Sequence, residues 1–494
     1  MRYFFLMPLM LLPVVALADA STFDVKQYGA TGNSTNMDTA AIQQAIDAAA
    51  GAGGGTVVFP PGKYLSASLD LKSHVTLQLD EGATLLGSPH QSDYRKVNFH
   101  GLLLADRQQD IAVCGKGVID GQGEMLAADT EKLFGHGKLP DAKEDQRPVI
   151  INFRNCTNVT VQDITLKNSA CWVEDYRDCD HLTVADIKVR SNAAKNNDGI
   201  DVDGCTHVVV RGCDIVSEDD SICLKSADKA CDDVLVENCR ASSTCNALKF
   251  GTSSAAGFRN ITCRNLEIYD TKISGIALEI VDGGEMENVN ISHINITNSH
   301  NAIFIRLGHR NVHGAAGSLH HVTLSDITAG IPKMPESDRR AALITASITG
   351  QPGNPVEDIT LTNISIVYGG IGSVPKPGDV DLNDLGRVPE CATVYPESRM
   401  FGTLPAWGFY CRHVAGIHFD NVILRVQGQD YRPALVCDDA KDIELNGFHV
   451  QSAGREPVIV FNDVIGAAIH DSVAPSGATS FLKTMGNTRD IQGL

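Results

Sequence analysis

The sequence is poor in aromatic and in basic residues. Aromatic side chains make up 6% of the 494 residues, only two residues are tryptophan, and 41 lysines and arginines are outnumbered by 60 aspartates and glutamates, for a net charge of −19. This acidic balance argues against a protein that binds nucleic acid or coats a polyanion through bulk charge, although it leaves room for a local basic pocket. Glycine is plentiful instead, and the 45 glycines suit a fold with many tight turns.

A long hydrophobic run is also missing after residue 20. Residues 3–17 are apolar, follow Arg2, and precede Ala18-Asp19-Ala20, which has the small residues of a cleavage site. This pattern predicts a secretory signal peptide over 1–20, cleaved after Ala20, and a mature protein that is periplasmic or secreted. A membrane anchor is the alternative, but the stretch is short and contains two prolines. We therefore expect no membrane span.

A self-similar unit recurs along the chain. Each copy alternates apolar and polar positions, as in NVTVQDITLKN, HLTVADIKVRS and NVNISHINITN. Counted from the residue before each run, the copies begin at 158, 181, 207, 233, 260, 288, 321, 358, 416, 442 and 468. Most steps are 23 to 33 residues, and this period with a two-residue alternation indicates a solenoid of strands, that is, a parallel β-helix. The step from 358 to 416 must contain an insertion.

The repeats and the length together predict one elongated domain. A solenoid grows by stacking, so 494 residues do not require a second compact core. Residues 38–49 have apolar side chains at helical spacing, with Asp38 as a suitable N-cap, and predict a helix that covers the first coil. We expect an all-β catalytic domain over 21–494, with this capping helix and with loop insertions near 124–148 and 330–415.

The fourteen cysteines fall partly on the repeat. Two offsets recur, one shared by Cys156, Cys179, Cys205 and Cys231 and the other by Cys213 and Cys239. Because stacked coils are about 4.8 Å apart, each set forms a ladder of neighbours that could form disulfides or remain as buried thiols. Cys391 and Cys411 lie in the long insertion and are candidates for a loop-closing bridge. No cysteine has metal-site spacing with histidines.

A second strand of each coil can be aligned in register. Five successive copies read DGIDVD from Asp198, DSICLK from Asp220, NALKFG from Asn246, SGIALE from Ser274 and NAIFIR from Asn301. The third and fifth columns are apolar throughout, so they face the core, and the fourth and sixth columns face outward. A solvated charged face is the simplest reading of the outward columns. The first column, however, stacks acids on adjacent coils, which is a poor purely structural choice because like charges repel.

The stacked acids Asp198, Asp219 and Asp220 are suited to breaking a glycosidic bond. Close carboxylates raise one another's pKa values, so one can hold a proton near neutral pH while another stays ionised. The protonated acid can donate to the leaving oxygen, and ionised partners can deprotonate a water on the opposite side of the sugar ring. Three acids around a water-sized gap fit inversion better than retention.

At these residues the chain resembles glycoside hydrolase family 28, the polygalacturonases and their relatives. Asn196-Asn197-Asp198 resembles the family's Asn-x-Asp motif, Asp219-Asp220 its Asp-Asp motif, and GVIDGQG at 117–123 an early marker. NSACW at 168–172 is similar to the Asn-Ser-Pro-x-Trp of bacterial members. The resemblance covers nearly the whole mature chain. It implies a right-handed β-helix and inverting hydrolysis, with Asp219 as general acid and with Asp198 and Asp220 holding the attacking water.

The chain departs from the family pattern at two motifs. Cys245-Asn246-Ala247 stands where the family has Gly-His-Gly, and Ala277-Leu278-Glu279 stands where it has Arg-Ile-Lys, which contacts the galacturonate carboxylate. Lys249 and Arg306 on the outward columns could receive a carboxylate from another position or pair with Glu279. We expect a pectin-like acidic or branched polysaccharide other than plain polygalacturonate. The predicted substrate-binding residues are Asn196, Asn246, Lys249, Glu279 and Arg306.

Three further features are open to two interpretations. Trp172 could stack on a sugar ring or could simply pack. His309 follows Arg306 closely enough to reach a cleft, although lone histidines are mostly structural or solvated. The insertion between 358 and 416 could wall one end of the groove, as excursions from a solenoid often build the binding face, and cleavage would then proceed from chain ends.

Two other classes of function fit the same residues. A calcium-dependent polysaccharide lyase can use a β-helix whose acids hold the metal and whose lysine or arginine is the base. A noncatalytic carbohydrate-binding protein is the other alternative. The hydrolase prediction requires no metal and no cofactor, and its partner is a polysaccharide or oligosaccharide rather than nucleic acid.

Overall fold

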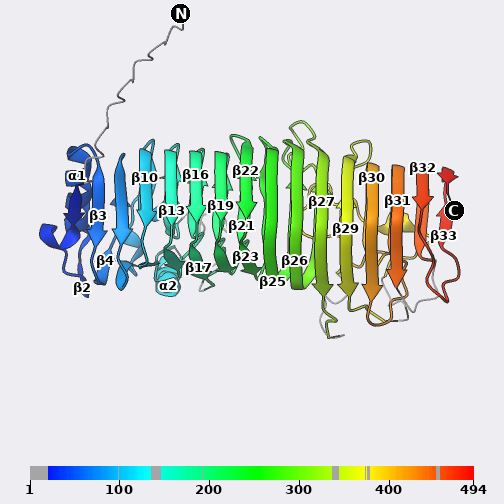
Figure 1. Cartoon of the computed structure of the whole chain (residues 1–494), viewed down its shortest axis with the longest axis horizontal. Coiled ribbons are helices and arrows are strands. Elements are labelled where there is room, and N and C mark those ends of the chain that lie inside the picture. Colours follow the sequence, from blue (N-terminus) through cyan, green and yellow to red (C-terminus); the bar gives the residue numbers. More distant parts are fainter. Residues whose placement is uncertain are drawn as a thin grey trace, which may run out of the picture.

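The computed structural model describes residues 21–97, 99–134, 146–192, 194–335, 344–372, 374, 379–451 and 457–493. These residues wind into one elongated stack of strands, with the N-terminal helix at one end and the C-terminal strands at the other (Figure 1). Successive coils pair in parallel, and the fold is the predicted right-handed parallel β-helix. Right-handed connection is the rule for parallel strands because of their twist.

The strands form three parallel faces. The first face contains β1 (Thr22–Asp24), β3 (Gly55–Phe59), β6 (Val75–Leu79), β10 (Gln109–Cys114), β13 (Thr157–Gln162), β16 (Asp180–Ala185), β19 (Thr206–Arg211), β22 (Cys231–Glu237) and β34 (Arg489–Gln492). The second contains β2 (Asn33–Met37), β4 (Gly62–Ser66), β7 (Ala83–Gly87), β11 (Val118–Asp120), β14 (Thr165–Lys167), β17 (Lys188–Ser191), β20 (Asp214–Ser217) and β23 (Arg240–Ser243). The third contains β5 (Leu69–Asp70), β9 (Phe99–Asp106), β12 (Val149–Arg154), β15 (Glu174–Arg177), β18 (Ile200–Asp203), β21 (Ile222–Ser226), β24 (Leu248–Ser254), β28 (Ala346–Thr349) and β33 (Leu482–Met485).

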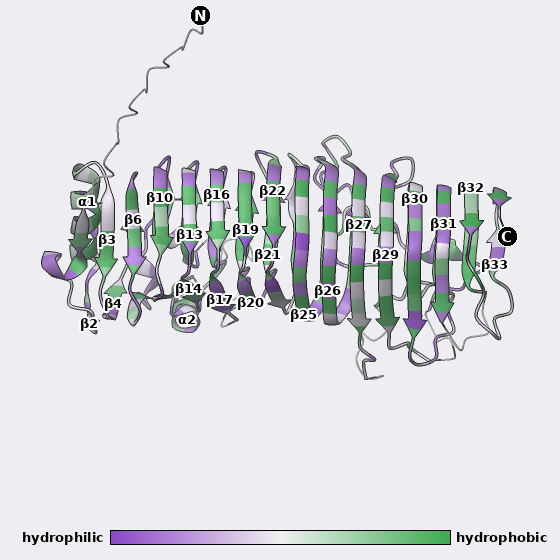
Figure 2. Ribbon diagram, in the orientation of Figure 1, coloured by the Kyte–Doolittle hydropathy of each residue, from purple (hydrophilic) through white to green (hydrophobic). Residues whose placement is uncertain are grey.

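From the middle of the chain onward, single long strands continue around the corners between faces. They are β25 (Phe258–Ile280), β26 (Glu285–Leu307), β27 (Ser318–Ile331), β29 (Val356–Tyr368), β30 (Phe409–Val426), β31 (Leu435–Gln451) and β32 (Ile459–His470). The short β8 (Lys96–Val97) pairs antiparallel with β9. Short 3-10 turns occur at Val25–Tyr28, Gln91–Asp93 and Leu385–Arg387. Hydrophobic and hydrophilic residues alternate along these strands (Figure 2), as a coil with one buried side requires.

Each repeat begins at a corner of the coil. The residues at 158, 181, 207, 233, 260, 288, 321, 358, 416 and 442 all have positive φ. Asparagine, aspartate, histidine and glycine occupy them, which are the residue types that tolerate the left-handed conformation best. The last copy has its left-handed residue at Gly466 rather than at the predicted 468. The long step from 358 to 416 does contain an insertion, because β29 and β30 pair directly.

The apolar columns predicted from the alignment stack inside the coil. Ile200 pairs with Ile222 on the next coil, which pairs with Leu248, and the column continues through Ile276 to Ile303. These five side chains are at most 1% exposed. Because each such side chain contributes about 1.5–3 kcal/mol by burial, the columns hold neighbouring coils in register.

The predicted capping helix is α1 (Thr39–Gly51). Its buried residues Ile42, Ala45, Ile46 and Ala49 pack on the first coils. Asp38 occupies the N-cap position, but its carboxylate makes no cap hydrogen bond and accepts from the Thr31 and Gly32 backbone N–H groups instead. The residue therefore ties the preceding loop to the helix. The predicted signal peptide lies outside the described residues, and no helix among those described is long and apolar enough to cross a bilayer.

The two predicted insertion ranges contain different structures. The range 124–148 includes most of α2 (Gly123–Phe134). The range 330–415 includes β28 and β29 and a long excursion after them. Residues 379–408 of that excursion, here named the covering segment, lie over the third face and pack apolar side chains against Ala277 and Phe304 of β25 and β26.

All fourteen cysteines are free thiols, and most are buried. The ladders at 156–231 and 213–239 are therefore stacked thiols, with the Cys179 backbone N–H donating to the Cys205 Sγ at 3.3 Å. The predicted bridge between Cys391 and Cys411 is wrong. Cys411 belongs to β30 and is buried in the coil, whereas Cys391 packs in the apolar cluster of the covering segment, so the two thiols belong to different layers.

Candidate active site

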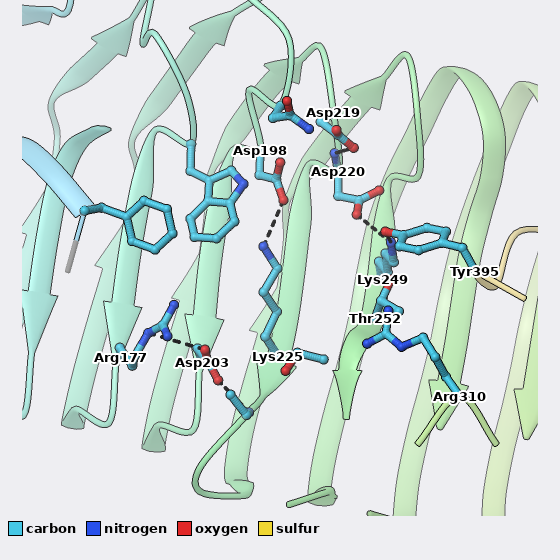
Figure 3. A pocket seen from close by; sticks show the side chains of 15 residues that line it. Arg177, Asp198, Asp203, Asp219, Asp220, Lys225, Lys249, Thr252, Arg310 and Tyr395 are labelled. Carbon is cyan, nitrogen blue, oxygen red and sulfur yellow. Dashed lines mark hydrogen bonds and ion pairs between the residues drawn. The ribbon is translucent and has the colours of Figure 1, made fainter. Parts of the chain in front are cut away.

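The predicted acids meet at the start of neighbouring strands on the third face. Asp198 precedes β18, Asp219 and Asp220 precede β21, and Asn246 precedes β24. Backbone pairing holds these starts in register, since Gly199 N donates to Asp220 O at 2.8 Å. The structure therefore brings three carboxylates from two adjacent coils into one place (Figure 3).

A cavity of about 400 Å³ opens in front of these acids. Phe99, Trp172, Tyr395 and Arg310 line it. Figure 3 shows Tyr395 and Arg310 on the side away from Arg177 and Asp203. The rest of the wall is almost entirely polar. It includes the acids Asp198, Asp203, Asp219 and Asp220 and the cations Arg177, Lys225 and Lys249.

Asp198 is held by Lys225. The Lys225 Nζ donates to Asp198 Oδ2 at 3.0 Å and lies 2.6 Å from Asp201 Oδ1 beneath it. The same ammonium lies 3.9 Å from the centroid of the Trp172 ring, a cation–π distance. Burial and the charge of Asp220 raise the pKa of Asp198, and the contact with Lys225 opposes that rise. Lys225 is thus the group that favours the ionised form of this carboxyl.

Asp220 has a second lysine and an amide of its own. Lys249 Nζ lies 3.0 Å from Asp220 Oδ2. The Asn246 side-chain amide and backbone N–H donate to Asp220 Oδ1 at 2.8 Å and 3.1 Å. Although burial raises the pKa of Asp220, Lys249 and these hydrogen bonds outweigh it and hold the pKa below its usual range. Asp220 is therefore the carboxylate that stays ionised.

Asp219 differs because no cation contacts it among the described residues. Its Oδ1 accepts the Asp220 backbone N–H at 3.0 Å, and it lies within 4.8 Å of the Asp220 carboxylate. Burial, together with the charges of Asp198 and Asp220, raises the pKa of Asp219 to about 8. This carboxyl can hold a proton in neutral solution beside an ionised neighbour, which is the arrangement that acid–base catalysis requires.

Only some of the predicted substrate-binding residues line the cavity. Asn196 does, and its amide oxygen accepts from Arg147 at 2.7 Å. Lys249 does as well. Asn246 is 2% exposed and acts through Asp220 instead. Glu279 and Arg306 are 0% and 1% exposed and are absent from the cavity wall.

The outward columns are mostly buried rather than solvated. The fourth column, from Asp201 to Phe304, is at most 2% exposed throughout, and the pairing register is the predicted one. The covering segment packs on the later positions, and Arg306 donates to the carbonyl of Glu390 within that segment at 2.6 Å. Arg306 thus lies beneath an extra layer that the repeat does not reveal, and Glu279 is buried next to it on the adjacent strand.

The remaining candidates also divide into residues that line the cavity and residues that do not. Trp172 is half-buried, lines the cavity and also packs against Phe99 at 4.8 Å between ring centroids, so both interpretations apply. His309 contacts the carbonyl of Gly314 and is not part of the cavity wall. Of the cavity residues not predicted to bind substrate, Lys225 could be found from the sequence because it lies in the outward columns. Phe99, Arg310 and Tyr395 come from loops or strand ends outside the alignment, and no repeat signal marks them.

Several acid, thiol and imidazole groups are close enough to share a metal ion. Among the described residues these are Asp198, Asp201 and Cys223; Asp219, Asp220 and Cys245; Asp180, His181 and His207; and Glu285, Glu287 and His320. The first two groups border the cavity, but lysine ammonium groups already contact their Asp198 and Asp220 carboxylates. Their thiols are poor ligands for calcium, which prefers oxygen.

Comparison with known proteins places this geometry in a family. The model of glycosyl hydrolases family 28 matches residues 55–379, well over half of the chain and all three acids. The chain belongs to glycosyl hydrolase family 28. An exopolygalacturonase structure from Thermotoga maritima superposes with a TM-score of 0.64 at 20% identity, covering 82% of this chain and 91% of that one. At that identity the superposition supports the fold.

Sequence relatives of this family 28 chain match over shorter stretches. A protein named "Probable polygalacturonase" from Vitis vinifera is 27% identical over 227 residues, which cover 42% of this chain and 45% of the relative. The exo-poly-alpha-D-galacturonosidase of Dickeya chrysanthemi is 36% identical over 144 residues, 26% of this chain and 24% of the relative. The chain therefore aligns with less than half the length of either relative.

The family 28 chain departs from its motifs in a way that the geometry explains. Asn246, which stands in place of the motif histidine, donates to Asp220, and Ser274 N donates to the Asn246 amide oxygen at 3.1 Å, which fixes the amide's orientation. Lys249 extends from the coil before Ala277 and supplies the cation beside Asp220. Asp220 is thus ion-paired and hydrogen-bonded in this chain without the motif histidine.

Proposed function

We propose that the protein is a secreted or periplasmic glycoside hydrolase that cleaves a pectin-like acidic or branched polysaccharide with inversion. Asp219 is the general acid that protonates the leaving oxygen. Asp198 and Asp220 hold and deprotonate the attacking water. The observation that carries the proposal is the unequal placement of cations, since Lys225 binds Asp198, Lys249 binds Asp220, and Asp219 has neither.

The pKa pattern gives the proposed reaction its pH range. Asp219 must be protonated to act as an acid, and its pKa is raised to about 8 by burial and by its acidic neighbours. Asp220 must be ionised, and Lys249 and Asn246 hold its pKa low. Asp198 must be ionised as well, and burial raises its pKa, so activity is expected between the ionisation of Asp198 and that of Asp219 and should fall as the pH rises through about 8 in the free enzyme.

Replacement of the acid tests the assignment. Asp219→Asn keeps the shape and removes the proton donor, so we expect kcat to fall by roughly 10²–10⁴-fold, the usual contribution of acid–base catalysis. Turnover would be measured on pectic and rhamnogalacturonan polysaccharides, with circular dichroism to confirm folding. Asp228→Asn, an exposed aspartate after β21, is the matched control and should retain full activity. Unchanged turnover in the Asp219→Asn variant would refute the proposal.

The shape of the cavity supports cleavage from chain ends. Tyr395 of the covering segment lies against Lys249, with its hydroxyl 3.3 Å from the Nζ, and so closes the side of the cavity beyond β24. An enzyme that accepts only chain ends releases short products from the start of a digest. Mixed long oligomers at early times would contradict end-wise cleavage, and the anomer released, followed by NMR, would test inversion.

The same digests separate the hydrolase from its two alternatives. A calcium-dependent lyase would release an unsaturated product that absorbs in the near ultraviolet and would lose activity with chelator. The lysines bound to Asp198 and Asp220 favour the hydrolase, because a cation bound there would have to displace two ammonium groups. Binding without product formation on any of these polysaccharides would favour the noncatalytic alternative.

A further inference from the structure

The strand that the family resemblance assigns to carboxylate recognition cannot perform that role here. Ala277 and Glu279 occupy the two positions of the missing cations, and both are 0% exposed. Ala277 packs in the apolar cluster under the covering segment. If the substrate carries a carboxylate next to the cleaved bond, another residue of the cavity must bind it.

Four cations line the cavity among the described residues, and they differ in availability. Lys225 and Lys249 contact the carboxylates of Asp198 and Asp220, and their side chains are 13% and 3% exposed. Arg177, at 15%, contacts Asp203 of the cavity wall. Arg310 is 36% exposed, and its partner is outside the wall. Arg310 is therefore the cation that substrate can reach without displacing a wall carboxylate.

Asp282 fixes the Arg310 guanidinium in one orientation. The Nε donates to Asp282 Oδ1 at 2.8 Å and the Nη2 donates to Asp282 Oδ2 at 2.6 Å. These two bonds use one edge of the planar fork and leave the Nη1 hydrogens for a second acceptor. Figure 3 shows the guanidinium at the edge of the cavity, beside Thr252 and Lys249. Because the fork is already held, little conformational entropy is lost on binding an anion.

The surroundings of Arg310 suit an acidic ligand. Thr252 lines the same corner, is 6% exposed, and its hydroxyl lies within reach of the Tyr395 hydroxyl. Glu279 lies behind this corner, and burial raises its pKa to about 8, so in neutral solution the carboxyl is largely uncharged and does not repel an anion. The corner thus offers a fixed guanidinium edge and a hydroxyl.

We propose that Arg310, with Thr252, binds the carboxylate of an acidic sugar next to the cleaved bond, and that the enzyme thereby selects a free acid over its ester. The inference rests on the proposed function, because it names the substrate group recognised in the same cavity. The guanidinium provides a charge-assisted hydrogen bond from a strand connection rather than from the family's Arg-Ile-Lys strand.

Binding of digalacturonate and of its methyl ester tests the proposal. The two probes differ in the negative charge of the carboxylate and in the methyl group that replaces it, and the full-length protein carries Asp219→Asn to prevent turnover. In this background the free acid should bind more tightly than the ester. Arg310→Gln should weaken binding of the free acid by roughly ten- to a hundredfold, the usual range for a charge-assisted hydrogen bond, and leave the ester nearly unchanged. Absence of any preference for the free acid would overturn the inference.

Two further variants distinguish a direct contact between Arg310 and the carboxylate from indirect effects of the substitution. Arg190→Gln breaks an arginine–aspartate pair outside the cavity, with Asp214, that is somewhat more exposed than the Arg310–Asp282 pair, and it should change neither affinity. Arg310→Gln with Asp282→Asn avoids an unpaired Asp282, whose charge could itself repel the acid. The same loss in this double variant supports a direct contact, whereas recovery of wild-type affinity overturns it. Hydrolysis that depends on Asp219 while selectivity ignores Arg310 would leave the proposed function standing without this inference.

Discussion

Two neighbouring stretches of the third face have polar residues at the same outward positions, but only one of them borders the cavity. On β18 and β21, Asp203 and Lys225 are paired across adjacent coils and line the cavity. On β25 and β26, Glu279 and Arg306 are paired in the equivalent way and are buried. The backbone register is the same in both, so the difference comes from the covering segment, whose apolar side chains pack on the second stretch.

The comparison shows that an outward position on a coil is not necessarily a position in contact with solvent or substrate. Arg306 uses its guanidinium to bind the carbonyls of Gly350 and Glu390 and the hydroxyl of Thr349. It therefore joins β26 to the next coil and to the covering segment. Lys225 and Lys249 instead form ion pairs with Asp198 and Asp220, the carboxylates of the proposed reaction. Charged residues of the outward columns thus have a structural role in one stretch and, in our proposal, a chemical role in the other.

The largest expected effect is a loss of stability, which distinguishes the structural role from the chemical one. Arg306→Met leaves the Gly350 and Glu390 carbonyls without their donors in a buried layer, so the free energy of unfolding should fall by about 2–4 kcal/mol. Chemical denaturation would measure the loss. Arg425→Met removes the same charge from an exposed position on β30 and should have little effect. Retained stability with lost activity would make Arg306 a substrate contact, as the sequence alone suggests.

Most of the coil could be predicted from the sequence because every turn repeats the same physical constraints. The two-residue alternation places Ile200 and Val202 inward, and the residue that opens each copy must tolerate a left-handed corner. Both signals recur, so they reinforce one another, and the strand register between coils follows. The exception was the last copy, where Gly466 at the corner precedes a weaker alternating run.

The site could be predicted only where it follows that repeat. Asp198 and Asp220 occupy the same column, and their meeting is a consequence of register. Tyr395 and Arg310 belong to segments without periodicity, and the burial of Glu279 depends on how the covering segment packs. The pairing of Cys391 with Cys411 failed for the same reason, since proximity in an insertion cannot be derived from spacing.

The second effect tests the chemical role of the lysines. Lys249→Met removes the cation that lowers the pKa of Asp220, so this pKa should rise and the acidic limb of the kcat/KM profile should move to higher pH. We expect a loss of about ten- to a hundredfold on the acidic side, because a buried carboxylate loses its partner. A pH–rate profile measures it. Lys229→Met, an exposed lysine near Asp178, is the control, and an unmoved acidic limb would contradict the role.

A smaller effect concerns how the stability of the protein depends on pH through Glu279 of the buried stretch. Burial raises the pKa of Glu279 to about 8 in the folded protein, above its ordinary value of 4.5. The stabilising contribution of the neutral carboxyl is therefore complete below about pH 4.5 and is lost as the pH rises through about 8. Glu279→Gln mimics the neutral form. On going from pH 5 to pH 9, the free energy of unfolding of this variant should therefore increase by about 1 kcal/mol or more relative to that of the wild type. Unfolding at both pH values checks this, with the exposed Glu267→Gln as control, and an equal pH dependence in variant and wild type would refute it.

The smallest effect lies at the boundary between the two stretches, where Tyr395 of the covering segment meets Lys249. Tyr395→Phe removes the hydroxyl 3.3 Å from the Lys249 Nζ but keeps the ring that closes the cavity. We expect kcat/KM to fall only about two- to fivefold, since Asp220 still neutralises Lys249, and we expect the product pattern to stay the same. Tyr395→Ala removes the ring as well and should lengthen the early products. If the early products of Tyr395→Ala stayed as short as those of the wild type, the covering segment would bury the second stretch without shaping the cavity of the first.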